Sequence, residues 1–268
     1  MNCQVDIIII GDSKAGHETV KNIASANPEI KVAFISREFK STTTHDYLNV
    51  EYVKEEVVFT DYRNRLFGCY LKNGDRIYGT HLIIASGLQY EPLMLHNKQV
   101  PCVFNNTDDI PKNSKNQPAI VIGNNNADVK FALTVAKKYK YVYLCTKSLN
   151  IENTTAANVK KLTDSKNIQI LPNTSILKVF APEGILQKVD LDNYSTVTCS
   201  AIYVKTASKP EVSFVSDKLI KKDLEGYLEV LANAESALVP KCFAIGNCVK
   251  NYTNKMNKLM VENILKDF

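Results

Sequence analysis

Two glycines and a serine near the start of the chain have the spacing of a phosphate-binding turn. An apolar run ends at Gly11, and Ser13 and Gly16 follow it. In the G-x-G-x-x-G fingerprint, the first glycine makes the turn, the second lets backbone touch a pyrophosphate, and the third lets the helix approach the strand. Because the middle position is serine and Asp12 adds negative charge, two interpretations stay open. One is a pyrophosphate site, and the other is a strand–turn–helix corner without a ligand.

An acidic residue follows the second predicted strand. That strand covers residues 31–35, and Glu38 comes shortly after it. In dinucleotide folds an acid about 20 residues past the glycines bonds the ribose hydroxyls. Glu38 therefore becomes a candidate ribose ligand, with a solvated loop acid as the alternative.

The glycine pattern recurs, in weaker form, after a second apolar run at 119–122. Gly123 takes the first position, Asn125 the middle one and Asp128 the third. A carboxylate near a helix start can cap the free N–H groups itself. The sequence therefore predicts that Asp128 takes the role of an anion at this turn.

Cysteines and histidines offer little chemistry by their spacing. The seven cysteines are odd in number and no two form C-x-x-C, which predicts neither a disulfide framework nor a zinc site. Most lie in apolar, strand-like contexts and are expected to be small buried side chains. The four histidines are dispersed, so no metal site is expected, and no catalytic residue is identified.

Composition sets the broad class. In 268 residues, 45% are apolar and 23% charged, which predicts a globular protein of one large or two medium domains. The net charge of +5 is spread out, so neither nucleic acid nor a membrane is expected as a partner. No run reaches the roughly 20 apolar residues of a membrane span, and the first residues enter a strand, so no signal peptide is expected. A reducing, cytoplasmic location is the expectation.

The predicted elements occur in a duplicated order. A strand–helix–strand unit, an antiparallel meander and a further strand appear once near the N-terminus and again after residue 118. Residue patterns predict helices over 18–26, 129–138, 159–165 and 254–266. This order predicts an α/β fold with two Rossmann-like dinucleotide-binding domains.

Two further motifs give the chain a family resemblance. The stretch Ile83-Ile84-Ala85-Ser86-Gly87 looks like the "IIATG" strand of the pyridine nucleotide–disulfide oxidoreductase superfamily. Residues 224–230 and 242–248 look like that superfamily's closing element. The low-molecular-weight thioredoxin reductases are the most similar group. The resemblance implies three-layer ββα domains, the second inserted in the first. The FAD-binding domain would comprise 1–109 and 238–268, and the NAD(P)-binding-like domain 113–235.

The resemblance also implies binding residues. In the first domain, FAD would be held by Gly11, Ser13, Gly16, Glu38, Ser86, Gly87, Gly246 and Asn247. In the second, NAD(P)H would be held weakly by Gly123, Asn125 and Lys147.

The departures from the family pattern decide the expected function. Where the reductases carry C-x-x-C, this chain has Cys102 alone, and Asn247 replaces the closing aspartate. We therefore expect a thioredoxin reductase-like FAD-dependent oxidoreductase without a redox-active dithiol. It would pass electrons from NAD(P)H or a partner, such as a small electron-transfer protein, to an unidentified acceptor. The alternative is a degenerate flavoprotein homologue with weak or no cofactor binding, acting in interaction or regulation.

Two structural questions stay open at this level. The apolar stripe of the terminal helix predicts either a homodimer contact or packing onto its own domain. Cys248, which follows Gly246-Asn247, is either redox-active or a packing residue, and so is Cys102.

Overall fold

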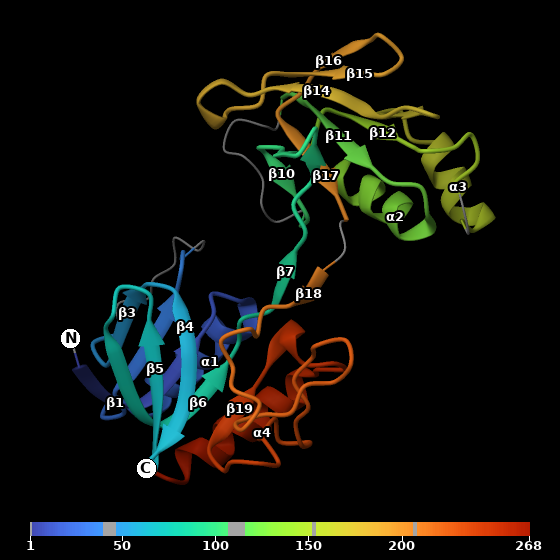
Figure 1. Ribbon diagram of the computed structural model, residues 1–268. Helices are drawn as coiled ribbons and strands as arrows, with labels where there is room; N and C mark the ends of the chain where they lie inside the picture. The colour runs from blue at the N-terminus through green and yellow to red at the C-terminus, as the bar shows by residue number, and fades with distance from the viewer. Residues whose placement is uncertain (1, 40–46, 107–115, 152–153, 206–207) are drawn as a thin grey trace. The chain divides into compact units, whose positions relative to one another are not determined.

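The chain forms two compact α/β units. The structure is a computed structural model that describes residues 2–39, 47–106, 116–151, 154–205 and 208–268. The first unit is Met1–Gln89 with Ser208–Phe268, and the second, Tyr90–Ala207, is inserted within it (Figure 1). Each unit has parallel strands covered by helices on one face. Antiparallel strands continue that sheet in the first unit and form a separate sheet in the second, so the predicted fold of two Rossmann-like domains is confirmed.

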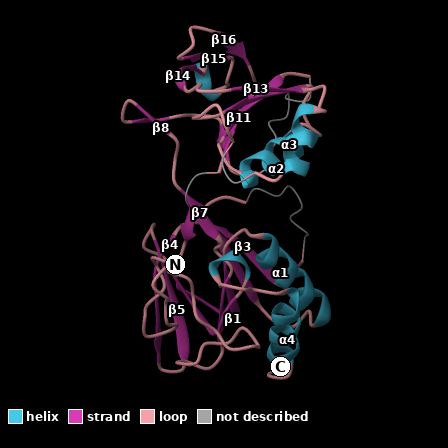
Figure 2. Cartoon of the chain, turned by 90° about the vertical axis from the view of Figure 1, so that its right-hand side faces the viewer, coloured by secondary structure: helices cyan, strands magenta, loops and turns pink. Residues whose placement is uncertain are grey.

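Seven strands form the sheet of the first unit. They are β1 (Asn2–Ile10), β2 (Val32–Ser36), β3 (Val50–Lys54), β4 (Val57–Arg63), β5 (Leu66–Leu71), β6 (Arg76–Ile84) and β19 (Cys242–Ala244). Their order is β3-β2-β1-β6-β5-β4, with β19 also paired to β6. β3, β2, β1, β6 and β19 run parallel, and β4 and β5 are antiparallel. Helices α1 (Lys14–Ala26) and α4 (Asn254–Leu265) lie side by side (Figure 2).

The second unit repeats this plan on a smaller scale. Its parallel sheet has the order β10-β17-β11-β12-β13, and a three-stranded antiparallel sheet has the order β14-β15-β16. The strands are β10 (Val103–Phe104), β11 (Pro118–Ile122), β12 (Tyr141–Cys145), β13 (Ile168–Leu171), β14 (Ile176–Phe180), β15 (Lys188–Leu191), β16 (Thr196–Thr198) and β17 (Ala201–Val204). The helices are α2 (Asn126–Val135) and α3 (Ala156–Thr163). The smaller elements are β8 (Met94–Leu95), β9 (Lys98–Gln99) and the 3₁₀ turn Pro182–Gly184.

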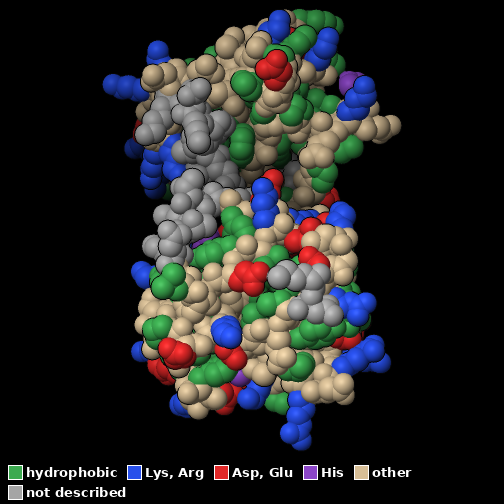
Figure 3. All heavy atoms as spheres, turned by 90° about the vertical axis from the view of Figure 1, so that its left-hand side faces the viewer, with side chains coloured by type: hydrophobic (Ala, Val, Ile, Leu, Met, Phe, Trp, Pro, Cys, Tyr) green, Lys and Arg blue, Asp and Glu red, His purple; other side chains and the backbone are tan. Residues whose placement is uncertain are grey.

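A short ladder marks where the chain leaves the first unit and returns. β7 (Leu88–Tyr90) pairs with β18 (Ser208–Pro210). Within the described residues, no helix is long and apolar enough to cross a membrane. On the face of the molecule seen in Figure 3, acidic and basic side chains are interspersed over the first unit.

Burial on both faces explains the unbroken apolar run of β1. Ile7 and Ile9 join the core on the helix side, whereas Ile8 and Ile10 join the core on the opposite face. All four are at most 5% exposed. Burying such a side chain stabilises a fold by about 1.5–3 kcal/mol, so β1 contributes strongly to the stability of the first unit.

The boundary between the units differs from the sequence-based one. Val212, Phe214, Ile220 and Leu228 belong to the same core cluster as Ile8, so the chain has rejoined the first unit by residue 208. The sequence placed that return near residue 238, because this stretch consists of turns and short bridges without strand periodicity. On the outward path the chain leaves the first unit after Gln89, and the expected stretch 109–113 lies outside the described residues.

Helices α1, α2 and α3 begin three or four residues earlier than their apolar periodicity predicts. In each, a polar residue before the helix accepts a hydrogen bond from its first turn: Ser13, Asn125 and Thr155, respectively. Such N-caps extend a helix into residues that contribute little to the apolar face.

The turn after β1 is forced to be glycine by backbone packing. Gly11 has φ +115°, and a Cβ there would lie 2.4 Å from the carbonyl oxygen of Ala85. A Cβ on Gly16 would lie 2.4 Å from the carbonyl oxygen of Gly11. The two glycines therefore allow the ends of β1, β6 and α1 to touch.

We predict that Gly11→Ala destabilises the protein by about 3 kcal/mol or more, since strained φ and overpacking add. Gly74→Ala is the matched control, because Gly74 also has positive φ (+91°) but no atom within 4 Å of an added Cβ. We expect the control to cost about 1–2 kcal/mol. Urea unfolding measures both, and equal losses would show that the close approach to Ala85 is absent.

A buried histidine ties the first sheet to the end of the described chain. His81 in β6 is 1% exposed, and its Nε2 lies 3.0 Å from Asp267 Oδ2. Lys241 Nζ also lies 3.0 Å from that carboxylate oxygen. Burial lowers the pKa of His81 despite its hydrogen bond to the Asp267 carboxylate. Hydrogen bonds from His81 and Lys241 lower the pKa of Asp267.

We predict that stability falls as the pH drops below the ordinary histidine pKa of about 6.5. There the unfolded chain binds a proton that buried His81 resists, so the unfolded state gains. His81→Gln should flatten this dependence between about pH 7 and pH 5, whereas the surface variant His96→Gln should leave it unchanged. Urea unfolding across this range measures it, and an unaltered slope in His81→Gln would contradict it.

Candidate functional site

The parallel strands of the first sheet end at one level. Ile10 is in register with Ile35 on one side and Ile84 on the other, and Ile84 is in register with Ala244. The next residues continue the ladder: Gly11 N donates to the Ile35 carbonyl at 2.9 Å. In open α/β sheets, ligands bind beyond such carboxyl ends. All the residues expected to hold FAD follow these strand ends or begin α1.

Ser13 fills the middle position of the glycine turn without strain. Its φ of −84° suits any residue, and its Oγ accepts a hydrogen bond from Gly16 N at 3.1 Å. Opposite it lies Gly246, with φ +76°, at the start of the 3₁₀ turn Gly246–Cys248. A Cβ on Gly246 would lie 3.2 Å from Ala15 Cβ and 3.8 Å from Ser13 Oγ. The turn after β19 therefore sits close against the start of α1.

The extra acid of this turn has a partner. Asp12 Oδ1 contacts His17 Nε2, and the Asp12 side chain is 7% exposed. The His17 ring packs edge-on against Phe34, with ring centroids 5.1 Å apart. The contact with His17, a residue of α1, turns the Asp12 carboxylate toward that helix. It therefore reduces the repulsion between Asp12 and a bound phosphate that the sequence suggested.

Glu38 lies where a ribose ligand is expected, beyond the end of β2. It is solvent-exposed, and its backbone carbonyl accepts a hydrogen bond from Ser36 Oγ at 2.8 Å. Its neighbour Arg37 instead pairs with Glu211 and, at 3.9 Å, with Glu56. The Glu38 side chain therefore remains exposed to solvent beyond the end of β2.

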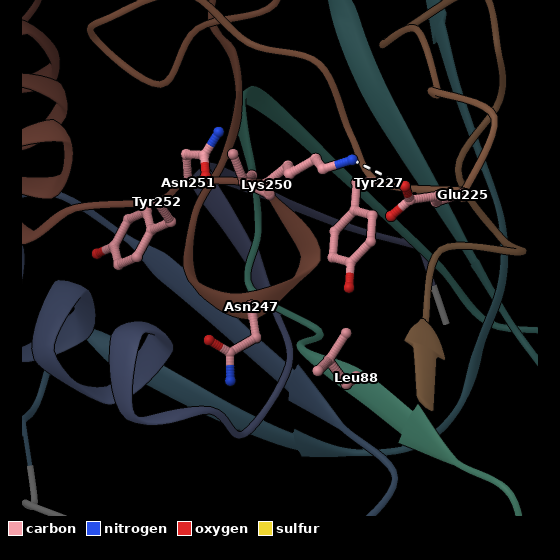
Figure 4. A pocket seen from close by; sticks show the side chains of 8 residues that line it. Leu88, Glu225, Tyr227, Asn247, Lys250, Asn251 and Tyr252 are labelled. Carbon is pink, nitrogen blue, oxygen red and sulfur yellow. Dashed lines mark hydrogen bonds and ion pairs between the residues drawn. The ribbon is translucent and has the colours of Figure 1, made fainter. Parts of the chain in front are cut away.

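A pocket of about 320 Å³ opens beside the 3₁₀ turn Gly246–Cys248, which we call the closing turn (Figure 4). Its lining consists of Leu88, Glu225, Tyr227, Asn247, Val249, Lys250, Asn251 and Tyr252. In the close-up, Asn247 lies between the two tyrosines, and Lys250 Nζ pairs with Glu225 at 2.9 Å. Small-molecule pockets span about 300–1,000 Å³, so this volume suits one ring system rather than a whole dinucleotide.

Sequence reasoning placed Asn247 in the site but missed the two tyrosines. Tyr227 lies within a stretch used only as a family motif, and Tyr252 follows the closing turn. Aromatic residues near a predicted ligand turn were the available signal. Their convergence depends on Leu228 pairing with Val249, a contact between distant segments.

Cys248 and Ser86 follow the ends of β19 and β6 at this edge of the sheet. The Cys248 side chain is fully buried, and its thiol donates to the Ile245 carbonyl at 3.1 Å. Burial raises the pKa of this thiol to about 11, although a hydrogen bond with the Gly87 backbone opposes the rise. Cys248 is therefore protonated near neutral pH. All seven cysteines are free thiols, including Cys102, which donates to the Gly184 carbonyl at 2.8 Å.

The corresponding turn of the second unit is capped by its own side chains. Asn125 and Asp128 form a capping box at the start of α2, and Asp128 is 7% exposed. Lys147 is exposed beyond the end of β12. Two like unit charges about 4 Å apart repel by about 4 kcal/mol at an effective dielectric constant of about 20. A helix N-terminus returns only about 0.3–1 kcal/mol to an anion. The Asp128 carboxylate therefore opposes a pyrophosphate at this turn, whereas the corresponding turn of the first unit holds the neutral Ser13 hydroxyl.

Within the described ranges, no group of three or more His, Cys, Asp or Glu side chains is placed to hold a metal ion.

Comparison with known structures finds the same fold in thioredoxin reductases. The enzyme from Streptococcus pyogenes MGAS5005 superposes with TM-score 0.67 at 15% identity, covering 100% of both chains. That from Lactococcus lactis gives 0.65 at 16% identity, covering 98% of this chain and 100% of its own. That from Giardia duodenalis gives 0.63 at 19% identity, covering 98% and 99%. No curated protein sequence matches the chain.

The family model described as pyridine nucleotide-disulphide oxidoreductase matches residues 10–246, which run from the end of β1 to the closing turn. These limits enclose both glycine turns and the whole inserted unit. The chain therefore belongs to the pyridine nucleotide-disulphide oxidoreductase family.

Proposed function

We propose that the protein is a thioredoxin reductase-like, FAD-dependent oxidoreductase that works without a dithiol of its own. It takes electrons from NAD(P)H or a partner protein, such as a small electron-transfer protein, and passes them to another acceptor. The observation that carries the proposal is that the parallel strands of the first sheet end in register, so that their carboxyl ends lie side by side. There Gly11, Gly16 and Gly246 let two strand ends and the start of α1 pack closely together, which brings the N-terminus of that helix to the carboxyl ends of the strands.

The remaining residues of that edge take positions along the cofactor. Gly11, Ser13 and Gly16 would hold the pyrophosphate, and Glu38 the adenosine ribose. Ser86, Gly87, Gly246 and Asn247 would follow the chain toward the ring end. The pocket beside Asn247, with a tyrosine on each side, offers a space of ring size there.

When bound, the flavin supplies the electron transfer itself. The chain's own residues would bind, orient and shield. Tyr227 and Tyr252 would exclude water from the sides of the pocket, and the Asn247 amide would donate and accept hydrogen bonds at its floor. Lys250 is held by Glu225 at the rim, so its charge is balanced before any ligand enters.

The state of the thiols supports an acceptor other than the chain's own disulfide. Disulfide exchange needs a thiolate and a second thiol that can close on it. Cys248, the cysteine at the proposed flavin edge, is buried and protonated, and its thiol is held by a backbone carbonyl.

A second candidate is a degenerate homologue that binds cofactors weakly or not at all and acts through interactions. The capping box of α2 favours it, because one of the two inherited nucleotide turns no longer suits a phosphate. Absence of flavin binding would decide for this candidate.

We predict that the purified protein carries FAD, or takes it up in preference to FMN, with the absorbance of bound flavin. Glu38→Ala should weaken FAD binding about tenfold, since a hydrogen bond to a charged group contributes about 1.5–3 kcal/mol. Glu29→Ala is the matched control, because that exposed acid precedes β2 at its opposite end. Protein that stays colourless after incubation with FAD would refute the proposal.

We also predict no reduction of thioredoxin by the flavin-loaded protein with NADPH or dithionite beyond the free-flavin background. Cys102→Ser and Cys248→Ser variants run beside it should give the same background. If the unaltered protein turns over and either variant does not, a dithiol relay exists and this part of the proposal fails.

A further inference from the structure

The turn of the second unit holds a carboxylate where a dinucleotide phosphate would lie. Asp128 Oδ2 accepts hydrogen bonds from Asn124 N at 2.8 Å and from Asn125 N at 3.1 Å. Both donors belong to the loop between β11 and α2. Such loop and helix-start N–H groups are the ones that bind phosphate in nucleotide folds.

The first N–H groups of α2 are also taken. Asn125 Oδ1 accepts from Ala127 N at 2.8 Å and from Asp128 N at 3.1 Å. Four backbone donors of this turn are thus satisfied by two side chains of the turn itself. An incoming phosphate would have to displace them and would gain no new donor from the exchange.

The glycine of the turn serves this internal carboxylate. A Cβ on Gly123 would lie 2.3 Å from both Asp128 Cβ and Asp128 Cγ, and 2.6 Å from Oδ2. The space that a glycine leaves for a ligand is therefore filled by the Asp128 side chain. Glycine is therefore required here for packing, as at Gly11.

Side chains from neighbouring elements also hydrogen-bond to the turn between β11 and α2. Ser148 Oγ donates to Asn124 Oδ1 at 3.1 Å, which links the end of β12 to the turn. On the other side, Asn158 of α3 donates from Nδ2 to Asn126 Oδ1 at 2.7 Å, and Asn158 is 9% exposed. These bonds hold the turn in its closed arrangement from both sides.

We infer that Asp128 is a built-in anion that takes the place of the pyrophosphate, so the second unit takes no nicotinamide dinucleotide. The statement that the second unit binds no nicotinamide dinucleotide does not depend on whether the first unit binds FAD. Its consequence rests on that function: the donor becomes a partner protein or another reductant that reaches the first unit directly.

The test measures dinucleotide binding apart from flavin chemistry. NADH, NADPH and ADP-ribose are titrated by calorimetry into the protein as purified. We compare it with Asp128→Ala, which removes charge and volume, and Asp128→Asn, which removes the charge alone. Asp164→Asn is the matched control, because Asp164 is an exposed acid of the same unit, just after α3.

We expect no saturable binding up to 1 mM by the unaltered protein or by Asp164→Asn. Asp128→Ala should bind at least tenfold more tightly and should melt at a lower temperature, because its cap is lost. Should Asp128→Ala fail to fold by circular dichroism, Asp128→Asn keeps an acceptor oxygen and should still bind measurably more tightly.

Two outcomes would overturn the inference. One is saturation of the unaltered protein by NADH or NADPH at any concentration up to about 1 mM. The other is a folded Asp128 variant that binds no better than Asp164→Asn. FAD content, read from absorbance in the same samples, reports separately on the proposed function, so the two failures are distinguishable.

Discussion

Everything proposed for the first unit depends on how closely the backbone of Gly11 approaches the end of β6. Gly11 N bonds to the Ile35 carbonyl, and Ala85 N bonds to the Ile10 carbonyl at 2.7 Å, so β1 is held level with both neighbours. The helix start, the β6 end and the β19 end then meet within van der Waals contact. A side chain at Gly11 would separate them and remove the edge on which a cofactor would lie.

The two units satisfy the N–H groups of their strand–helix turns with different side chains. A turn between a strand and a helix exposes N–H groups that need an acceptor. In the first unit Ser13, a neutral hydroxyl, takes one of them. In the second, Asn125 and Asp128 take four and add a negative charge. An anion can bind beside a hydroxyl, whereas a fixed carboxylate repels it. The duplicated fold has therefore kept its geometry in both halves while the chemistry of its turns has diverged.

Cys248 and the pocket both lie at the closing turn, so both bear on which electron acceptor the protein could use. Burial keeps the Cys248 thiol protonated under the edge, whereas Asn247 and Tyr227 line an open pocket. Redox chemistry at this edge would thus meet amide and phenol groups rather than a thiolate. A ring-sized space flanked by aromatic side chains suits a planar molecule, and nearby Lys250 is already neutralised by Glu225.

Sequence alone determined the fold class, because apolar runs, turn glycines and the duplicated element order are local patterns. It also determined that Asp128 would cap α2, since a helix cap acts within a few residues. It misplaced the return to the first unit, because Val212 and Leu228 reveal their partners only when packed beside Ile8. Only the tertiary structure paired Asp12 with His17 and brought Tyr227 and Tyr252 to the same pocket, since side-chain direction and long-range bridges follow from packing rather than from spacing.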